Sequence, residues 1–268
     1  MNQLQFTEAR ADFDRTIRLA PNEAEVYMNR ALAWEGLKEY ARALDDLNEA
    51  IRLGIPRTQV YFMRAAVREK SGDREGAKQD REEGTRRKPA DELSWVSRGL
   101  ARMATDPKGS LLDFDEALKL NPLSFHALQN KAHVLGERLG NDLEAIRVLD
   151  KEVALYPDSV LPRAGRGVHL ARLGKKEAAL ADARAALLRD TQPTNLYQVS
   201  GIYALTSKDD PKNRLRALEL LSLALKGGCG LQWVDTDKDL DPIRGCDEFK
   251  KLVQAARALQ PAQAKPAP

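Results

Sequence analysis

The histidines and cysteines are the side chains best suited to catalysis or metal binding, but their spacing does not assemble a reactive centre. His126 and His133 lie seven residues apart, so they would share one face of a helix and could contact a ligand together. No set of cysteine or carboxylate ligands accompanies them at the spacing of a zinc site. Cys229 and Cys246 have no base close in sequence, so an activated thiol is not supported. We therefore expect no metal site and no nucleophile.

An alternating acidic run at residues 235–239 resembles the start of a calcium-binding loop. An EF-hand loop needs glycine at its sixth position and a bidentate glutamate at its twelfth. Leu240 and Cys246 occupy those two places. The better interpretation is the start of a helix, with Asp241 as the N-cap and Pro242 at the first helical position. The sequence thus predicts no calcium site here.

Motifs that bind phosphate or cofactors are also absent from the sequence. There is no Walker loop, no GxGxxG after a strand, no HExxH and no GxSxG. The GGCG cluster at residues 227–230 lacks a phosphate-binding lysine and is typical of a turn. We therefore expect a chain that is not an enzyme and that carries no cofactor.

The elements that would position these side chains repeat along the chain. A small residue in a predicted first helix recurs every 33 to 35 residues, and a second small residue and a proline keep step with it. Repeats of this length are typical of stacked helical units. The first series is Ala31, Ala65, Gly99, Ala132, Gly167 and Gly201; the second is Ala9, Ala43, Ala77, Ser110, Ala145, Ala179 and Ala217; the prolines are Pro21, Pro56, Pro89, Pro122 and Pro157.

One unit shows the internal pattern most clearly. Its first helix opens with an aromatic residue followed four positions later by a small one, its second helix has small residues at corresponding places, and a proline follows. This pattern resembles the tetratricopeptide repeat (TPR). The matching residues are Tyr27, Ala31, Trp34, Ala43, Leu47 and Ala50, with the proline one residue late at Pro56. The resemblance implies an all-α fold, a right-handed superhelical solenoid of antiparallel helix pairs.

The period also sets the expected domain boundaries. Residues 1–23 read as a half-repeat that holds only a second helix, and residues 227–260 read as a segment that caps the last repeat. This segment resembles the tail of TPR arrays in large bacterial multidomain proteins. We expect six units at 24–57, 58–91, 92–124, 125–159, 160–193 and 194–226, and a disordered tail at 261–268.

The resemblance places the binding surface on the first helices, which line the concave face in the family. Many apolar residues at the corresponding positions could equally pack against neighbouring helices. Asn29 stands where one asparagine of the clamp for chaperone C-termini would stand, but Gln59 and Met63 replace the basic residues of that clamp. The predicted partner-binding residues are Glu25, Met28, Asn29, Leu32, Phe62, Glu69, Val96, Leu100, Gln129 and His133.

Composition narrows the classes of partner. A net charge of +3 is too mild to imply nucleic acid, and no apolar run approaches the length of a membrane span or of a signal-peptide core. We expect a bacterial, cytoplasmic scaffold that binds a peptide or a helix of another protein. One alternative is a regulatory segment of a bacterial signalling enzyme, such as a serine/threonine kinase; a less favoured one is an RNA-binding helical repeat. The half-repeat at the N-terminus could also form a homodimer.

Overall fold

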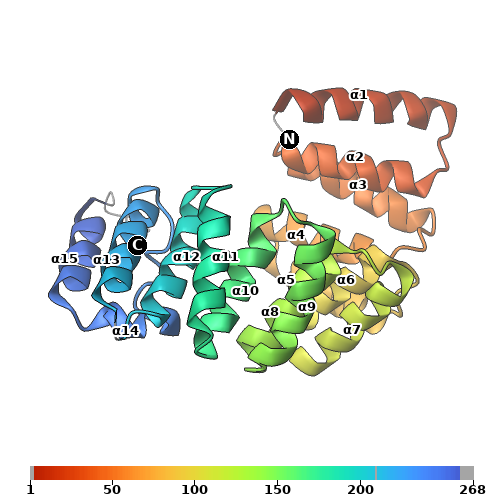
Figure 1. The fold of residues 1–268 in the computed structure, drawn as a ribbon. Coiled ribbons are helices and arrows are strands. Elements are labelled where there is room, and N and C mark those ends of the chain that lie inside the picture. Colours follow the sequence, from red (N-terminus) through yellow and green to blue (C-terminus); the bar gives the residue numbers. More distant parts are fainter. Residues whose placement is uncertain (1–2, 209, 260–268) are drawn as a thin grey trace. The chain divides into compact units, whose positions relative to one another are not determined.

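The computed structural model describes residues 3–208 and 210–259, and its internal contacts divide the chain into two compact units. Unit 1 is Met1–Asn130 and unit 2 is Lys131–Pro268 (Figure 1). The tail expected at 261–268 lies outside the described residues. Throughout the described ranges, all regular secondary structure is helical and no strand is present.

Unit 1 is a series of helix pairs. α2 packs against α3, α4 against α5 and α6 against α7, while α1 packs against α2 (Figure 1). α8 (Phe125–His133) begins in unit 1 and ends in unit 2. The other helices are α1 (Gln3–Leu19), α2 (Ala24–Gly36), α3 (Tyr40–Arg52), α4 (Gln59–Lys70), α5 (Arg74–Arg86), α6 (Glu92–Arg102) and α7 (Pro107–Leu120).

Unit 2 continues the pairing and ends in shorter elements. α10 packs against both α9 and α11, and α12 packs against α13. No described helix in either unit has both the length and the apolar composition needed to span a bilayer. The elements are the π-helical turn η1 (Val134–Arg138), α9 (Asp142–Leu155), α10 (Val160–Arg172), α11 (Lys176–Leu187), α12 (Pro193–Leu205), α13 (Pro211–Lys226), the 3₁₀ turn η2 (Lys238–Leu240), α14 (Asp241–Arg244) and α15 (Asp247–Leu259).

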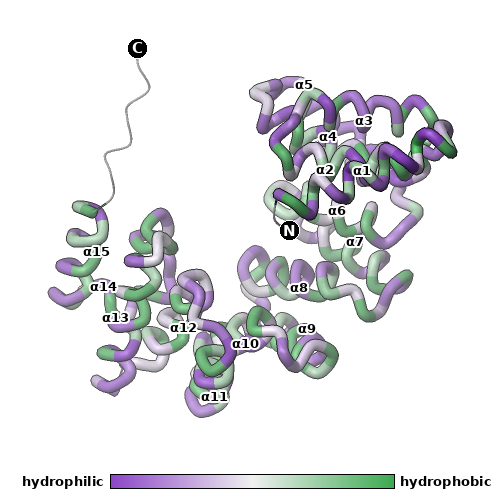
Figure 2. The backbone as a smooth tube through the Cα atoms, turned by 90° about the horizontal axis from the view of Figure 1, so that it is seen from above, coloured by the Kyte–Doolittle hydropathy of each residue, from purple (hydrophilic) through white to green (hydrophobic). Residues whose placement is uncertain are grey.

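The recurring small residues lie where paired helices approach one another. Ala31 and Ala43 are buried at 1% and 0% exposure, and a side chain on Gly99 would collide with the ring of Phe114. Larger residues such as Leu47 fill the remaining space. Hydrophobic and hydrophilic residues accordingly alternate along each helix (Figure 2).

The segment after α13 completes the core of unit 2. Val234, Leu240 and Ile243 are fully buried in the same apolar cluster as α12 and α13. Gly230 has φ +101° and lies under the ring of Tyr197, so only glycine fits there. The helix start expected at Asp241 is wrong by one residue: Leu240 is the N-cap of α14, and the Asp241 side chain bonds Arg244 instead.

A ladder of arginine–aspartate pairs joins the helices of four repeats. In each of these repeats, an arginine stands directly before the small residue of the first helix. It donates two hydrogen bonds to an aspartate of the second helix, which stands three residues after the small residue of that helix. The aspartate side chains are only 1–7% exposed. The pairs are Arg30–Asp46 (2.8 and 2.6 Å), Arg64–Asp80 (2.9 and 2.5 Å), Arg98–Asp113 (3.1 and 2.7 Å) and Arg166–Asp182 (2.7 and 2.7 Å).

Three of these arginines also reach the second helix of the preceding repeat. Their Nη1 atoms donate to an oxygen on that helix at 2.8 Å, so one guanidinium ties three helices together. The acceptors are Asp14 for Arg30, Asn48 for Arg64 and Asp150 for Arg166. Because each guanidinium holds a fixed fork of donors, the ladder fixes the stagger of adjacent helices.

Substituting Arg166 by alanine should destabilise the protein strongly, because Asp182 would remain buried without a counter-charge. We expect a loss of about 3–5 kcal/mol in the free energy of unfolding, measured by chemical denaturation. Adding Asp182→Ala should restore much of the loss. Arg147→Ala, which removes an exposed ion pair with Glu144, should change stability little. Equal effects of Arg166→Ala and Arg147→Ala would show that the ladder contributes nothing.

Glu152 of α9 breaks the small-residue pattern. It is fully buried, and neither carboxylate oxygen has a hydrogen-bond partner in the part of the chain that the structure describes. The corresponding residues in other repeats are small, as in Ala117 and Ala186. Burial raises the pKa of Glu152 to about 8. The folded protein therefore keeps a proton on this carboxyl between pH ~4.5 and ~8, where the unfolded chain has lost it.

Glu152 should make the protein less stable as pH rises from about 5 to about 8, because the unfolded state binds fewer protons in that window. Glu152→Ala should remove this slope and raise stability at pH 8 by roughly 2–5 kcal/mol. Denaturation curves at several pH values would measure both effects. Glu177→Ala, at an exposed position on α11, is the control and should keep the slope. A slope that survives Glu152→Ala would assign it to another group.

Candidate partner-binding surfaces

Leucines at equivalent positions of two first helices are among the exposed apolar residues of unit 1. Leu32 on α2 is 46% exposed and Leu100 on α6 is 47% exposed. α4 lies between them in the order of first helices and contributes the exposed Ala66. These three residues define the leucine row. Leu32 and Leu100 were both predicted from the sequence as partner-binding residues.

The other apolar residues expected on this surface lie mainly inside the helix packing. Met28 is 3% exposed and Val96 is 5% exposed. Phe62 is half-buried, with its ring directly over Gly84 of α5. These side chains face neighbouring helices, which is the packing role left open from the sequence. Among the apolar residues predicted for this surface, Leu32 and Leu100 are thus the exposed ones.

Ion pairs involve the same first helices as the leucine row, and one of them, Lys70–Glu35, joins successive repeats. Arg57 Nε lies 3.1 Å from Glu25 Oε1, and Lys70 Nζ on α4 lies 2.6 Å from Glu35 Oε1 on α2. Glu69 pairs with Arg81 of α5. The predicted residues Glu25 and Glu69 are thus exposed but already paired. Such exposed pairs contribute little to stability and can exchange partners.

The last three predicted residues are Asn29, Gln129 and His133, and they come from α2 and α8. Asn29 on α2 is half-buried. Gln129 on α8 is half-buried, and its side-chain oxygen is buried without a described hydrogen-bond partner. His133 is exposed at the last residue of α8 and belongs to unit 2.

Unit 2 has a polar pocket of about 610 Å³, and the sequence analysis missed it. The π-helical turn η1 forms one side, and the run that had been compared with a calcium loop forms another. Turns of this kind are rare and frequently lie at functional sites. The lining residues are Gly136, Glu137, Gly140, Asp142, Arg172, Leu205, Thr236, Asp237, Lys238 and Asp239.

Arg172 is the centre of this pocket. Its guanidinium donates to Asp239 at 2.8 and 2.8 Å and to Glu137 at 2.7 and 3.2 Å. Burial opposes the charge of Arg172, but the hydrogen bonds to Asp239 and Glu137 outweigh it and raise the pKa of the guanidinium. Burial also raises the pKa of Asp239 despite this bond. The pocket lining carries four carboxylates and two basic side chains, which favours a cationic group of a ligand.

A buried histidine supports the π-helical turn. His169 on α10 is 4% exposed, and its Nδ1 lies 2.7 Å from Asp142 Oδ1 on α9. The other side of the imidazole faces Gly136, where a Cβ atom would lie 2.0 Å from His169 Cε1. Gly136 thus allows η1 to pass close to α10. A glycine near a helix end was the only sequence signal for this arrangement.

The three aspartates of residues 235–239 point to three different partners. Asp235 pairs with Arg257, Asp237 accepts a hydrogen bond from Tyr197 at 2.9 Å, and Asp239 pairs with Arg172. Their role in the structure is to attach the C-terminal segment to α10, α12 and α15. Among the described residues, no group of three or more His, Cys, Asp or Glu side chains is placed to hold a metal ion.

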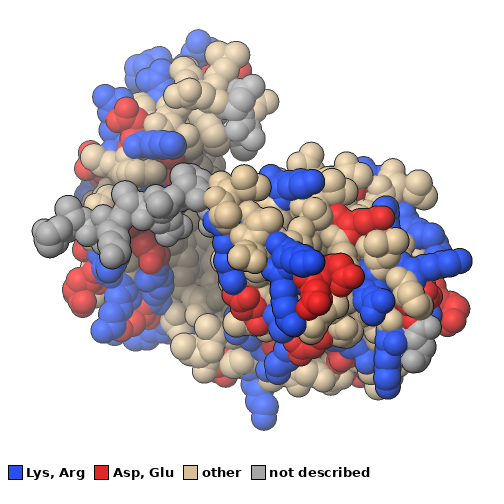
Figure 3. Space-filling model, turned by 90° about the vertical axis from the view of Figure 1, so that its left-hand side faces the viewer, with Lys and Arg blue, Asp and Glu red and all other residues tan. Residues whose placement is uncertain are grey.

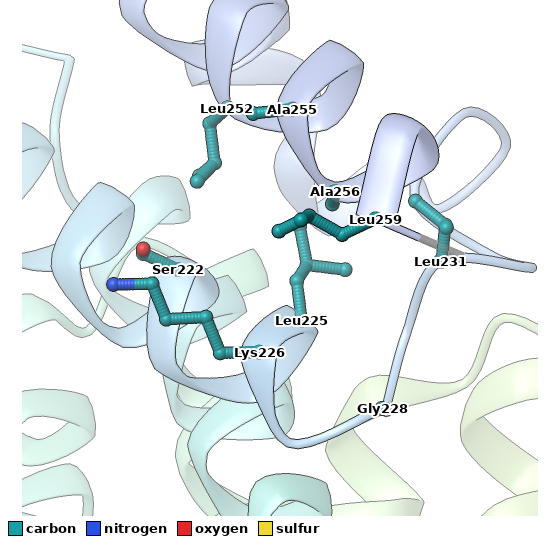
Figure 4. A pocket seen from close by; sticks show the side chains of 9 residues that line it. All are labelled: Ser222, Leu225, Lys226, Gly228, Leu231, Leu252, Ala255, Ala256 and Leu259. Atoms are coloured by element: carbon teal, nitrogen blue, oxygen red, sulfur yellow. The ribbon is translucent and has the colours of Figure 1, made fainter. Parts of the chain in front are cut away.

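A smaller, apolar pocket of about 280 Å³ lies between α13 and α15 (Figure 4). Leu225 comes from α13, Leu252 and Leu259 come from α15, and Leu231 comes from the connecting segment. Lys226 lies at its edge.

Charged side chains of both signs are interspersed on the molecular face in Figure 3, so that face offers no extended single-sign field.

Comparisons with known proteins identify the fold. No protein-family model matches the chain. Sperm-associated antigen 1 of Homo sapiens is 45% identical over 49 residues, which cover 18% of this chain and only 5% of that protein. The solved structures with similar folds share 12–18% of their residues with this chain, so they establish the architecture alone.

Three of these structures show the extent of the likeness. The APC/C hetero-tetramer Cut9-Hcn1 has a TM-score of 0.61 and 12% identity, over 94% of this chain and 46% of that chain. A tetratricopeptide repeat protein from Parabacteroides merdae has 0.57 and 18%, over 94% and 92%. The human IFIT1 dimer with PPP-AAAA has 0.58 and 13%, over 96% and 69%.

Gly136→Ala should disturb the polar pocket of unit 2, because the added methyl group would overlap the His169 ring. We expect a loss of about 1–3 kcal/mol in unfolding free energy from the displaced ring or backbone, measured by chemical denaturation. Gly245→Ala is the matched control, since a Cβ there meets no atom within 4 Å. An unchanged stability for Gly136→Ala would contradict the close contact between η1 and α10.

Proposed function

Because this chain has the fold of the tetratricopeptide repeat proteins, we propose that it is a non-catalytic protein-interaction module. Its first helices would bind an extended or helical segment of another protein. We place this activity in the bacterial cytoplasm on the sequence grounds given above. The curated relative matches over 49 residues only, so its name contributes nothing to the proposed activity.

The observation that carries the proposal is the exposure of the leucine row. Leu32 and Leu100 occupy the same place in repeats separated by one unit, and each leaves nearly half of its surface in contact with solvent. Scattered exposed leucines are common on protein surfaces. Leucines at equivalent positions on alternate first helices, with ion pairs on the same helices, fit a groove with an apolar floor and a polar rim.

A partner would place its own apolar side chains over these leucines. Burial of Leu32 and Leu100 would supply the main favourable term, and the bordering charges would restrict register and orientation. Glu25 and Glu69 can exchange their present partners, Arg57 and Arg81, for basic groups of the bound segment. Binding energy in such interfaces usually concentrates in a few central contacts.

The polar pocket of unit 2 would accept a different part of a partner. Its excess of carboxylates over basic groups favours a lysine or arginine side chain. Glu137 and Lys238 are exposed at this pocket, whereas Arg172 is already neutralised by its two carboxylate partners. We treat this pocket as a second contact region within the same proposed function.

The arginine–aspartate ladder favours a protein partner over RNA. Its arginines, Arg30, Arg64, Arg98 and Arg166, would be the natural phosphate ligands on the first helices, but each is held by a buried aspartate. Phosphate contacts require free cationic groups that release counterions. The comparisons add no support for a regulatory segment of a signalling enzyme.

Replacing both leucines by aspartate should abolish partner binding, because charged groups would occupy the apolar floor. A pulldown with the purified chain, followed by mass spectrometry, identifies the partner. Titration of that partner with the variant Leu32→Asp/Leu100→Asp should then show a loss of at least about tenfold in affinity. Circular dichroism should show the same helical content in the variant and the natural chain.

The matched control places the same charges on a second helix. Leu112 and Leu120 of α7 are 65% and 56% exposed, so Leu112→Asp/Leu120→Asp tests charge and solubility alone. It should bind normally. If the α7 variant lost the partner and the leucine-row variant kept it, the binding surface would lie on the second helices. Salt-dependent retention on RNA would instead support the nucleic-acid alternative.

A further inference from the structure

α1 has the residue pattern of a second helix, but no first helix of its own repeat covers it in the described structure. Its residues match those of α3 at a distance of 34 positions, with Ala9, Asp12, Phe13 and Thr16 in the places of Ala43, Asp46, Leu47 and Ala50. The α3 residues are all buried. On α1, Ala9 and Phe13 are half-buried, and Asp12 and Thr16 are exposed.

Asp12 is a ladder aspartate whose arginine is absent from the described residues. The equivalent residue of α3, Asp46, is held in a two-bond fork by Arg30. The carboxylate of Asp12 has no hydrogen-bond or ion-pair partner among the described residues. Asp14, two positions further on, already holds its own arginine, because Arg30 Nη1 donates to it at 2.8 Å. α1 therefore presents two aspartates to neighbouring helices. Asp14 is paired with Arg30 of α2, whereas Asp12 has no arginine partner among the described residues.

The ladder defines what would complete the other side. In the three repeats of unit 1, the covering helix supplies an arginine, a small residue directly after it, and an aromatic residue three positions before it. The guanidinium lies over that aromatic ring at 5.6 Å for Arg30 on Tyr27, 5.8 Å for Arg64 on Tyr61 and 4.7 Å for Arg98 on Trp95. The small residue allows the close approach, and the aromatic ring orients the arginine.

We propose that the exposed face of α1, formed by Ala9, Asp12, Phe13 and Thr16, binds a partner helix with the pattern aromatic–x–x–Arg–small. The arginine of that helix would form a two-bond ion pair with Asp12. Its small residue would face Ala9, and its apolar residues would cover Phe13. This surface lies on a second helix, so the inference does not depend on the leucine row.

Arginine is the required residue because the pairing uses two parallel N–H donors. A lysine offers a single ammonium group and cannot reproduce the fork. None of the three arginines of α1 has an aromatic residue three positions before it: Thr7, Asp12 and Arg15 precede Arg10, Arg15 and Arg18 at that distance. Arg10 stacks on Trp34 of α2 at 5.3 Å and lies 3.5 Å from Asp14. A symmetric pair of α1 helices would therefore lack the aromatic–x–x–Arg–small pattern of the covering helices.

The helix α2 of this chain provides the probe for a direct test. A synthetic peptide of residues 24–37, AEVYMNRALAWEGL, contains Tyr27, Arg30 and Ala31 in the required order. A side-chain bridge on its outer face would keep it helical in isolation. Its fluorescence anisotropy is measured while the full-length chain is titrated in. We expect saturable binding at one site.

Two substitutions test the contact from both sides. Asp12→Ala in the protein and Arg30→Ala in the peptide should each weaken binding about tenfold or more, and the two together should weaken it no further. An Arg30→Lys peptide should bind nearly as weakly as Arg30→Ala. Asp45→Ala, at an exposed aspartate of α3, is the matched control and should leave affinity unchanged.

Three results would overturn the proposal. The first is a peptide that does not bind, and the second is binding that is indifferent to both Asp12→Ala and Arg30→Ala. The third is a protein that dimerises in analytical ultracentrifugation and loses the dimer on Asp12→Ala, because the occupant would then be a second copy of the chain. Binding lost in Leu32→Asp/Leu100→Asp, with Asp12→Ala unaffected, would assign the peptide to the leucine row.

Discussion

The buried aspartate of each ladder step is the constraint on which the helix packing depends. A carboxylate that is only a few per cent exposed needs a counter-charge and several donors, and a single arginine on the adjacent helix supplies both. Because a guanidinium has a fixed shape, the helix that carries it cannot slide or rotate without losing bonds. Apolar packing alone would tolerate such shifts more readily. The ladder therefore specifies the register of helices whose contacts are largely between alanines and leucines.

The repeat at residues 125–159 departs from this rule, and several unusual features coincide there. Lys131 stands in the arginine position and Val148 in the aspartate position. In the same repeat, α8 ends in a π-helical turn and Glu152 replaces a small residue in the core. The division between the two units also falls at residue 130. The polar pocket of unit 2 thus lies beside one of the two repeats without an arginine–aspartate pair, the other being the last repeat, where Ser200 and Leu220 take the two positions.

The helical fold and the period could be predicted because they depend on small and apolar residues at fixed intervals, and the structure has all-helical pairs of the TPR kind. The surface was harder to predict. Met28 and Val96 have the same apolar character as Leu32 and Leu100, and a helical period alone does not separate residues that face a neighbouring helix from those that face solvent. The neighbouring helix decides this, and its position comes only with the structure.

The ladder itself could have been read from the sequence, since Arg30, Arg64, Arg98 and Arg166 each precede a small residue of the repeat. Mixed charges on helices usually indicate a solvated face. Under that interpretation, the fixed position of each arginine directly before a small residue was overlooked. For the acidic run at 235–239, the spacing did not indicate the partners of the carboxylates. Its alternation suggested one shared ligand, whereas its carboxylates serve Arg257, Tyr197 and Arg172 separately.

The π-helical turn has a consequence for how the array can change in length. The small residues Gly99 and Ala132 are 33 positions apart, and Ala132 and Gly167 are 35 apart, so the turn η1 lies in the longer interval. A π turn accommodates one more residue than an α turn. An extra residue can therefore be taken up within the turn itself. A single π-helical turn thus lets a periodic sequence gain one residue while the helices keep their packing.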